Sequence, residues 1–490
     1  MLGEVSMKTE NASGVHDFRA VAADCIDRLI EHGTDRYGEV HAPILVSILD
    51  AATLTCPESP RALDERWRVT RRGRRNPAGA NLLMDQPTLA AMFALSDATG
   101  VPSYSAFAER YIAWYLTHLV DEKGFWWWGW HRHYDVYRDT RDGHDGNHHE
   151  FHALHTVLWD EMWAIDADSV RREIEAIWTW HVIDKTTGEV NRHGDGRRGC
   201  DFSMTSAAFS RAFAFLFART GEHVWRERAV LLAGYFWDRR NPTTDLIAAR
   251  PNAGAARFDG SHLTTAEIGL NCRDLLSAFE YCGDERLLKY AVAYLRAYAR
   301  YGYDRDAGKF WGALRLDGSP ETGARITAAN VDSNEGYGAF EPRGHLDIWQ
   351  PYVAGYEHPT ATAEVYAIAY ELTRDDEMLE TALRFATSIL SVSPPRACLT
   401  GTWYEGYARE FAPLGAYAEQ YGRAIEFLSR LGRATGDRRF TGAARELATD
   451  AVTRLAENGL VRGHPAKPYY EATDGVGFLL RALIRLDETG

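Results

Sequence analysis

A short turn that usually contains glycine recurs five times along the chain, each time between two apolar segments. The turns are centred on Gly100, Gly221, Gly283, Asp375 and Gly436. In four of them glycine stands where a helix commonly ends in the left-handed backbone conformation, and an acidic or small residue follows to begin the next helix. The turns lie 61 to 121 residues apart, so each interval holds roughly one or two helical hairpins. This pattern is typical of repeated pairs of antiparallel helices, and it constrains the fold more than any other feature.

Apolar residues recur at the spacing of an amphipathic helix over most of the chain, and few segments read as strands. The segments that we predict to be helical are 15–29, 88–95, 104–119, 170–180, 206–217, 225–236, 266–279, 287–298, 362–372, 378–389, 421–431, 440–455 and 475–486. The sequence therefore predicts an all-α protein.

Two features favour a closed ring of hairpins over an open stack. Long loops rich in glycine and aromatic residues stand at the hairpin ends opposite the short turns, at 124–147, 184–202, 304–359 and 400–419. The chain also ends in an apolar helix without the polar outer face of a capping repeat. No change of composition marks a second domain. We therefore predict an α/α barrel, a toroid of about six or seven helical hairpins that forms a single catalytic domain over residues 1–490, with the long loops at one face.

Composition limits the partners of this protein. A formal net charge of −14 argues against a nucleic-acid binder, which needs a surplus of Lys and Arg on one face. The aromatic share of 12% suits a cleft that stacks sugar rings, although a large helical core also buries many aromatics. An acidic protein that binds an acidic glycan needs a locally positive cleft, supplied by arginines or a metal ion.

The six cysteines lack CxxC spacing and read as reduced thiols. The first residues lack a basic segment followed by an apolar one, and no stretch of the chain reaches the apolar length of a membrane span. We therefore expect a cytoplasmic protein that does not bind a membrane. The sequence gives no oligomeric state.

Histidines concentrate in one part of the chain. Besides His181, eight of the 18 histidines fall between positions 131 and 193, in loops that also carry Trp126–Trp128. Two imidazoles and one carboxylate that converge from separate loops suit a divalent cation and leave coordination positions open for substrate oxygens. His152, His155 and His181 are more simply read as surface or core histidines.

Three segments, taken in order, resemble the polysaccharide lyase family 2 pectate lyases, which fold as α/α barrels. They are Gly129-Trp130-His131-Arg132, then His149-Glu150 ahead of a helix with Leu158-Trp159, and then residues 177–184 leading to Arg192-His193-Gly194. The resemblance implies that His131, Glu150 and His193 bind one divalent metal ion. It further implies that Arg192 is the Brønsted base. The Trp126–Trp128 run and the loops of the second half depart from the family pattern, so the resemblance does not identify the uronate polymer.

This resemblance predicts a metal-dependent lyase that cleaves an acidic oligosaccharide or polysaccharide, of the pectate or oligogalacturonate kind, by β-elimination. Manganese, zinc, nickel or iron fits better than calcium, because imidazoles are poor calcium ligands. Arg192 serves as a base only if the metal, neighbouring cations and exclusion of water lower its proton affinity. Its alternative role is a clamp for a substrate carboxylate. Arg197 and Arg198 are natural clamps for neighbouring uronates.

Further substrate contacts are expected from basic and aromatic residues near or within loops. The candidates are Trp130, Arg132, His149, Arg273, Tyr337, Trp349, Tyr352, His358, Lys467 and Tyr469. Three alternatives stay open. A glycoside hydrolase of the same architecture needs two carboxylates across the scissile bond, which Glu335, Glu405, Glu471 and Asp474 can supply. An epimerase with two catalytic histidines and a non-catalytic carbohydrate-binding protein are the others, although the latter has no use for a His/His/Glu set.

Overall fold

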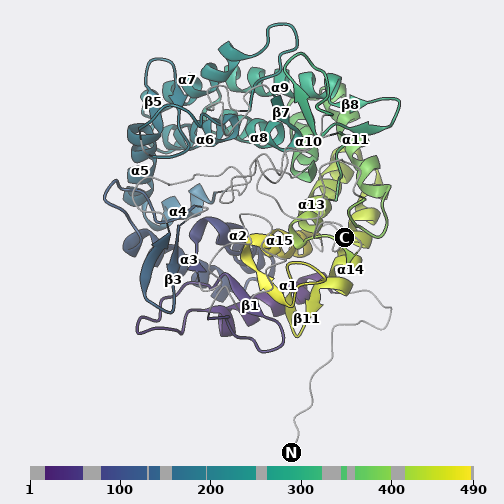
Figure 1. Cartoon of the computed structure of the whole chain (residues 1–490). Coiled ribbons are helices and arrows are strands. Elements are labelled where there is room, and N and C mark those ends of the chain that lie inside the picture. The colour runs from purple at the N-terminus through teal and green to yellow at the C-terminus, as the bar shows by residue number, and fades with distance from the viewer. Residues whose placement is uncertain are drawn as a thin grey trace, which may run out of the picture.

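A computed structural model describes residues 17–58, 79–129, 132–143, 157–194, 196–249, 262–322, 344–349, 359–398 and 414–486. Within these ranges the chain is mainly helical, and its few strands are short. Figure 1 shows the helices arranged as a ring.

An inner ring of helices surrounds the centre of the molecule. Its members in the described part of the chain are α2 (Leu82–Thr99), α4 (Trp159–Ile165), α6 (Ser203–Thr220), α8 (Thr265–Cys282), α10 (Pro359–Thr373), α13 (Ala418–Thr435) and α15 (Val476–Leu486). Neighbours pack against each other along the series from α6 to α15. The short α4 completes the ring, because Trp159 and Trp163 pack on Phe215 of α6, and the Leu158 amide donates to Gln86 of α2 at 2.7 Å.

An outer layer of helices covers the inner ring (Figure 1). It consists of α1 (Phe18–Arg28), α3 (Ser103–His118), α5 (Ala167–Ala176), α7 (His223–Arg239), α9 (Glu285–Tyr301), α11 (Asp376–Leu390) and α14 (Arg438–Leu455). From α2 onward, each inner helix packs on the outer helix that follows it, while α15 packs on α1. The last inner helix also packs on α2, so the two ends of the chain close the ring. The predicted α/α barrel with about seven hairpins is confirmed.

The short turns have the expected backbone geometry. Gly100, Gly221 and Gly436 end their helices in the left-handed conformation with φ of 71° to 72°, and Gly283 has φ of 66°. The fifth turn has no glycine, and Arg374 takes the left-handed conformation there with φ of 58°. Because these turns are short, inner and outer helices are antiparallel, and all inner helices begin at the same end of the ring.

Small antiparallel sheets stand in the longer connections at that end. They pair β1 (Ile48–Asp50) with β13 (Tyr469–Glu471), β2 (Gly79–Ala80) with β3 (Arg132–Asp135) and β4 (Thr140–Gly143), β5 (Val182–Asp184) with β6 (Glu189–Val190), β7 (His262–Thr264) with β10 (Ala313–Arg315), β8 (Tyr303–Asp304) with β9 (Lys309–Phe310), and β11 (Ala456–Glu457) with β12 (Leu460–Val461). The described parts of the longer connections therefore lie where the inner helices begin, as predicted.

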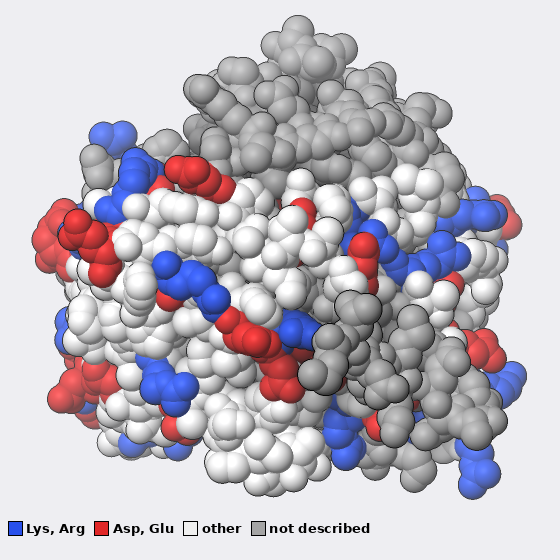
Figure 2. All heavy atoms as spheres, turned by 90° about the horizontal axis from the view of Figure 1, so that it is seen from below, with Lys and Arg blue, Asp and Glu red and all other residues white. Residues whose placement is uncertain are grey.

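On the side of the molecule that Figure 2 shows, positive and negative side chains are interspersed among the described residues. All six cysteines are free. Of the helices that the structure describes, none combines the length and the apolar character that a membrane span requires.

Candidate functional site

The loop that carries Arg192 and His193 follows the β5–β6 hairpin and leads into α6. The Arg192 amide donates to the Cys200 carbonyl at 3.1 Å, and the guanidinium carbon lies 4.3 Å from the Phe202 ring centre. The Arg192 side chain is almost fully buried, with 1% exposure, whereas His193 is partly exposed. Nε of Arg192 lies 3.5 Å from Nε2 of His193. The chain therefore places a water-excluded guanidinium directly beside an accessible imidazole.

Asn191 fixes the course of this loop. Its Oδ1 accepts a hydrogen bond from the His193 amide at 2.8 Å, and its Nδ2 donates to the Arg197 carbonyl at 2.7 Å. The Asn191 carbonyl accepts from Nδ1 of buried His181 at 2.7 Å. Sequence reasoning gave Asn191 no role, because its partners are backbone groups that only the folded loop brings together.

His181 is a core residue, as the simpler interpretation held. Its ring packs between Phe125 and Phe209, with centre distances of 5.0 Å and 4.9 Å. Burial lowers the pKa of His181 to about 3, and the charges of Arg132 and Lys123 act in the same direction. The imidazole is therefore neutral at physiological pH and donates its Nδ1 proton to the loop.

Acid is expected to destabilise the protein through His181. The unfolded side chain binds a proton near pH 6.5, whereas the folded one does so only near pH 3. Between these values the unfolded state binds more protons, so this contribution to stability is complete above pH 6.5 and is lost as the pH falls. His181→Asn keeps an N–H donor and removes the titration. The free energy of unfolding is measured by denaturant titration from about pH 4 to about pH 7. Its increase with pH should be smaller in the variant than in the parent by up to about 1.4 kcal/mol per pH unit. Equal slopes would contradict the assignment.

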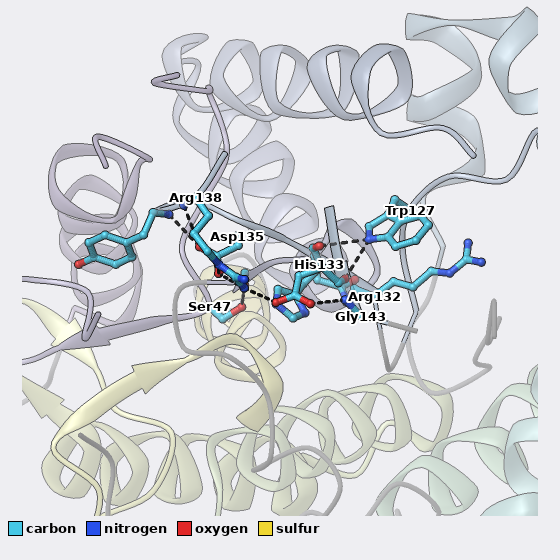
Figure 3. A network of polar contacts seen from close by, with 11 residues as sticks. Ser47, Trp127, Arg132, His133, Asp135, Arg138 and Gly143 are labelled. Carbon is cyan, nitrogen blue, oxygen red and sulfur yellow. Dashed lines mark hydrogen bonds and ion pairs between the residues drawn. The ribbon is translucent and has the colours of Figure 1, made fainter. Parts of the chain in front are cut away.

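Arg132 differs from its expected role as a substrate contact. Its side chain is 1% exposed, Nη1 lies 2.9 Å from Oδ2 of buried Asp121, and its guanidinium carbon lies 4.4 Å from the Trp127 ring centre. Figure 3 shows Arg132 on strand β3 beside Trp127, whose indole N–H donates to the carbonyls of His133 and Asp142. The Asp121–Arg132 ion pair is part of the framework that holds this strand.

Asp121 and Lys123 connect the two segments that the resemblance singled out. Asp121 pairs with Arg132, and the Lys123 ammonium donates to the Gly194 carbonyl at 2.5 Å. The Lys123 ammonium also lies 4.6 Å from the ring centre of Trp180, an exposed aromatic residue. Sequence reasoning missed both residues, because their partners are 11 and 71 positions away.

The tryptophan run before this strand belongs to the core. Trp126 and Trp128 are fully buried and pack edge to face with ring centres 5.0 Å apart. Glu173 accepts from the Trp126 amide at 2.8 Å and from the Trp128 indole at 3.0 Å, and burial raises the pKa of this carboxyl. These two rings are therefore not available to stack on a sugar.

Three other candidates for substrate contacts differ in their exposure to solvent. Arg197 and Arg198 are exposed on the Arg192 loop, and Arg198 lies 3.7 Å from Asp184 and 3.6 Å from Glu189. Trp349 is instead buried, with its indole donating to the Ile389 carbonyl. Arg197 and Arg198 are therefore accessible to a substrate, whereas Trp349 is not.

Lys467 also differs from its expected role. It is buried, and its ammonium lies 2.9 Å from Glu471 and 2.6 Å from Asp474. Glu471 and Asp474 are also the two described carboxylates that a glycoside hydrolase would use, and both are paired with Lys467. Tyr469 is partly buried on β13 opposite Asp50. Lys467 therefore pairs with carboxylates of the segment that precedes α15.

Seven candidates lie outside the described residues: Trp130, His131, His149, Glu150, Tyr337, Tyr352 and His358. Among the residues that the structure describes, no group of three His, Cys, Asp or Glu side chains is placed to hold a metal ion. His193 alone of the three predicted ligands is described, and its partly exposed imidazole fits such a role. A donor set of two imidazoles and one carboxylate has the chemistry that manganese, zinc, nickel and iron accept.

Known proteins resemble this chain in two ways: a family model matches the part of the sequence that includes Arg192 and His193, and solved structures match the fold. A family model described as periplasmic pectate lyase matches residues 64–221. That description contradicts the expected cytoplasmic location. The ring superposes on a family 76 glycoside hydrolase from a bovine Bacteroides thetaiotaomicron strain with a TM-score of 0.50 and 9% identity, over 97% of this chain and 78% of that one. An unsaturated glucuronyl hydrolase from Bacillus sp. GL1 gives 0.48 and 14% identity, over 96% and 95% of the two chains. The chain therefore has an α/α-barrel fold, and its match to the pectate lyase model over residues 64–221 supports a glycan-processing enzyme.

Proposed function

We propose that this protein is a metal-dependent lyase that cleaves a uronic-acid-containing glycan by β-elimination. The observation that carries the proposal is the buried Arg192 beside the accessible His193, within the segment that matches the pectate lyase family model. A glycoside hydrolase needs two carboxylates across the scissile bond instead, and the two described candidates for it, Glu471 and Asp474, are both paired with Lys467.

Arg192 is suited to act at C5 of the uronate. A bound divalent ion supplies neutralisation of the C6 carboxylate and of the charge that develops there. His131, Glu150 and His193 would hold it. Nε of Arg192 lies 3.5 Å from Nε2 of His193, so a substrate carboxylate bound at that imidazole would lie close to the guanidinium.

The elimination balances without a further reactant. The base removes the C5 proton, the electron pair forms the C4–C5 double bond, and the C4–O4 bond breaks. The departing O4 takes a proton from solvent or an acid. One product therefore carries an unsaturated uronate at its new end.

A panel of polyuronates and neutral glycans distinguishes the reaction types. Ultraviolet absorbance reports the new double bond, and a reducing-end assay reports any chain cleavage. A lyase gives both signals on a polyuronate, and a hydrolase gives reducing ends alone. Cleavage without absorbance on every acidic polymer would overturn the proposal, as would the absence of any reaction.

Removal of the metal is expected to abolish the absorbance signal. Dialysis against a chelator followed by readdition of manganese, zinc, nickel, iron or calcium tests this, with the metal content measured in parallel. Recovery with a transition metal and not with calcium is the expected result, because imidazole ligands suit the former. Full activity of a protein shown to be metal-free would contradict the metal requirement.

A further inference from the structure

Trp180 is the only tryptophan, tyrosine or phenylalanine that is exposed among the residues that the structure describes. Its exposure is 38%, whereas every other described aromatic ring of these three types is buried or half-buried. A single exposed apolar residue needs no functional explanation by itself. The place of this one calls for an explanation, because Trp180 lies beside the Arg192 loop.

The helix α5 brings Trp180 to the end of the ring where the longer connections lie. α5 is an outer helix, so it ends where the inner helices begin, and one π-helical turn, η5 (Ile177–His181), continues it. Arg172, Ala176 and Trp180 follow one another at intervals of four residues, which places them on one face of the helix. The turn before the tryptophan run packs on that face, since a Cβ atom added to Gly124 would lie 3.2 Å from Cγ of Arg172 and 3.9 Å from Cβ of Ala176.

Lys123, in the same turn, joins Trp180 to the Arg192 loop. Its ammonium lies over the Trp180 ring, 4.6 Å from the ring centre, and donates to the Gly194 carbonyl at 2.5 Å. Because one nitrogen makes both contacts, the ring stands next to the residue that follows His193. The cation–π contact also holds the ring in place, so less conformational freedom is lost when a ligand packs on it. A flat ring that is both exposed and held in place suits stacking on the apolar face of a sugar.

We propose that Trp180 stacks on a sugar unit of the substrate beyond the two units that share the cleaved bond, and that it thereby sets a preference for longer chains. This inference rests on the proposed function for the class of sugar, which is then a uronate of the same glycan. Lys123 is a positioning residue, because it holds the ring beside the loop. A contact of Trp180 with a second copy of the chain or with another protein would give no dependence on the length of the substrate.

Cleavage of oligogalacturonates of increasing length tests this subsite. In the parent protein KM should fall as the oligomer lengthens. Trp180→Leu keeps an apolar side chain and loses the flat ring, so KM for the long oligomers should rise by about tenfold, the usual scale for truncating an aromatic residue in a contact. The KM of the shortest oligomer that is cleaved should stay the same, as should kcat, because the reacting unit binds elsewhere.

Two further variants are the controls. Trp180→Phe keeps a flat ring and should retain most of the dependence on length, which a purely space-filling role of the indole would not give. Trp237→Leu is the matched control, since Trp237 also has a guanidinium over its ring, that of Arg240 at 3.7 Å, but is stacked on Tyr290 of α9 with ring centres 4.5 Å apart. This change should leave KM unaltered at every length.

Calorimetry separates the subsite from the lyase assignment. Long and short oligogalacturonates are titrated into Arg192→Ala, in which cleavage is suppressed, and into the same protein with Trp180→Leu added. The added change should weaken binding of the long oligomer by about tenfold and leave the short one unaffected. Binding through Trp180 without cleavage of any polyuronate by the parent would refute the lyase and leave the subsite standing. An equal effect of Trp180→Leu on short and long oligomers, or no effect on either, would overturn the subsite even if the protein is a lyase. Absence of binding of every oligouronate would overturn both.

Discussion

Replacing Arg192 by alanine is expected to lower turnover by about 10²–10⁴-fold, the usual contribution of a general base. The guanidinium is buried against Phe202 and lies beside His193, so the substitution removes the group that we propose as the base. The His193 amide is held by Oδ1 of Asn191, which the substitution leaves in place, so metal binding should survive. The measurements are kcat and KM on the polyuronate that the parent protein cleaves fastest, with metal content determined on the same samples.

Two further variants give this prediction its controls. Arg192→Lys keeps a positive charge but loses the planar fork, and it should recover little activity if Arg192 is the base. Arg198→Ala removes an arginine of the same loop whose side chain is 72% exposed, and it should affect mainly KM. If Arg192→Ala raises KM at unchanged kcat, Arg192 is a carboxylate clamp, and the base is to be sought at His133, His148 or Tyr337.

Changing Asp121 to asparagine is expected to cost about 3–5 kcal/mol of unfolding free energy, because it leaves the buried Arg132 without its counter-charge. The amide oxygen can still accept from the amides of Lys123 and Phe125, which Oδ1 of Asp121 does now. The substitution therefore isolates the ion pair from the turn. Denaturant unfolding at neutral pH measures the difference.

The matched control is Glu175→Gln, which removes a partner of Arg171 from an ion pair on the surface of the neighbouring helix α5. Exposed pairs contribute at most about 1 kcal/mol, so this variant should be nearly as stable as the parent. The double variant Asp121→Asn with Arg132→Met removes the unpaired charge and should recover much of the loss. Equal effects of Asp121→Asn and Glu175→Gln would show that the buried pair has no special role.

The helices and their pairing were predictable from the sequence because the causes are local. Apolar spacing follows the turn of a helix, and the glycines at 100, 221, 283 and 436 provide the left-handed residue that ends one. Short turns then force antiparallel pairs, and repeated pairs close into a ring. The glycine signal is missing at one of the five turns, where Arg374 adopts the left-handed conformation that glycine adopts at the other four.

The pairing of buried charges was decided by the tertiary structure alone. Arg132, Lys467 and Arg273 were equally plausible as cleft cations by their residue type. In the folded chain Arg132 pairs with Asp121, and Lys467 pairs with two carboxylates of its own segment. Arg273 lies on α8, where its guanidinium is 3.6 Å from Asp274. A charge that leaves water needs a partner within a few ångströms, and only the folded chain shows which carboxylate is that partner. Arg192 and His193 are adjacent in sequence, so their closeness was predictable, while the burial of one beside the exposure of the other was not.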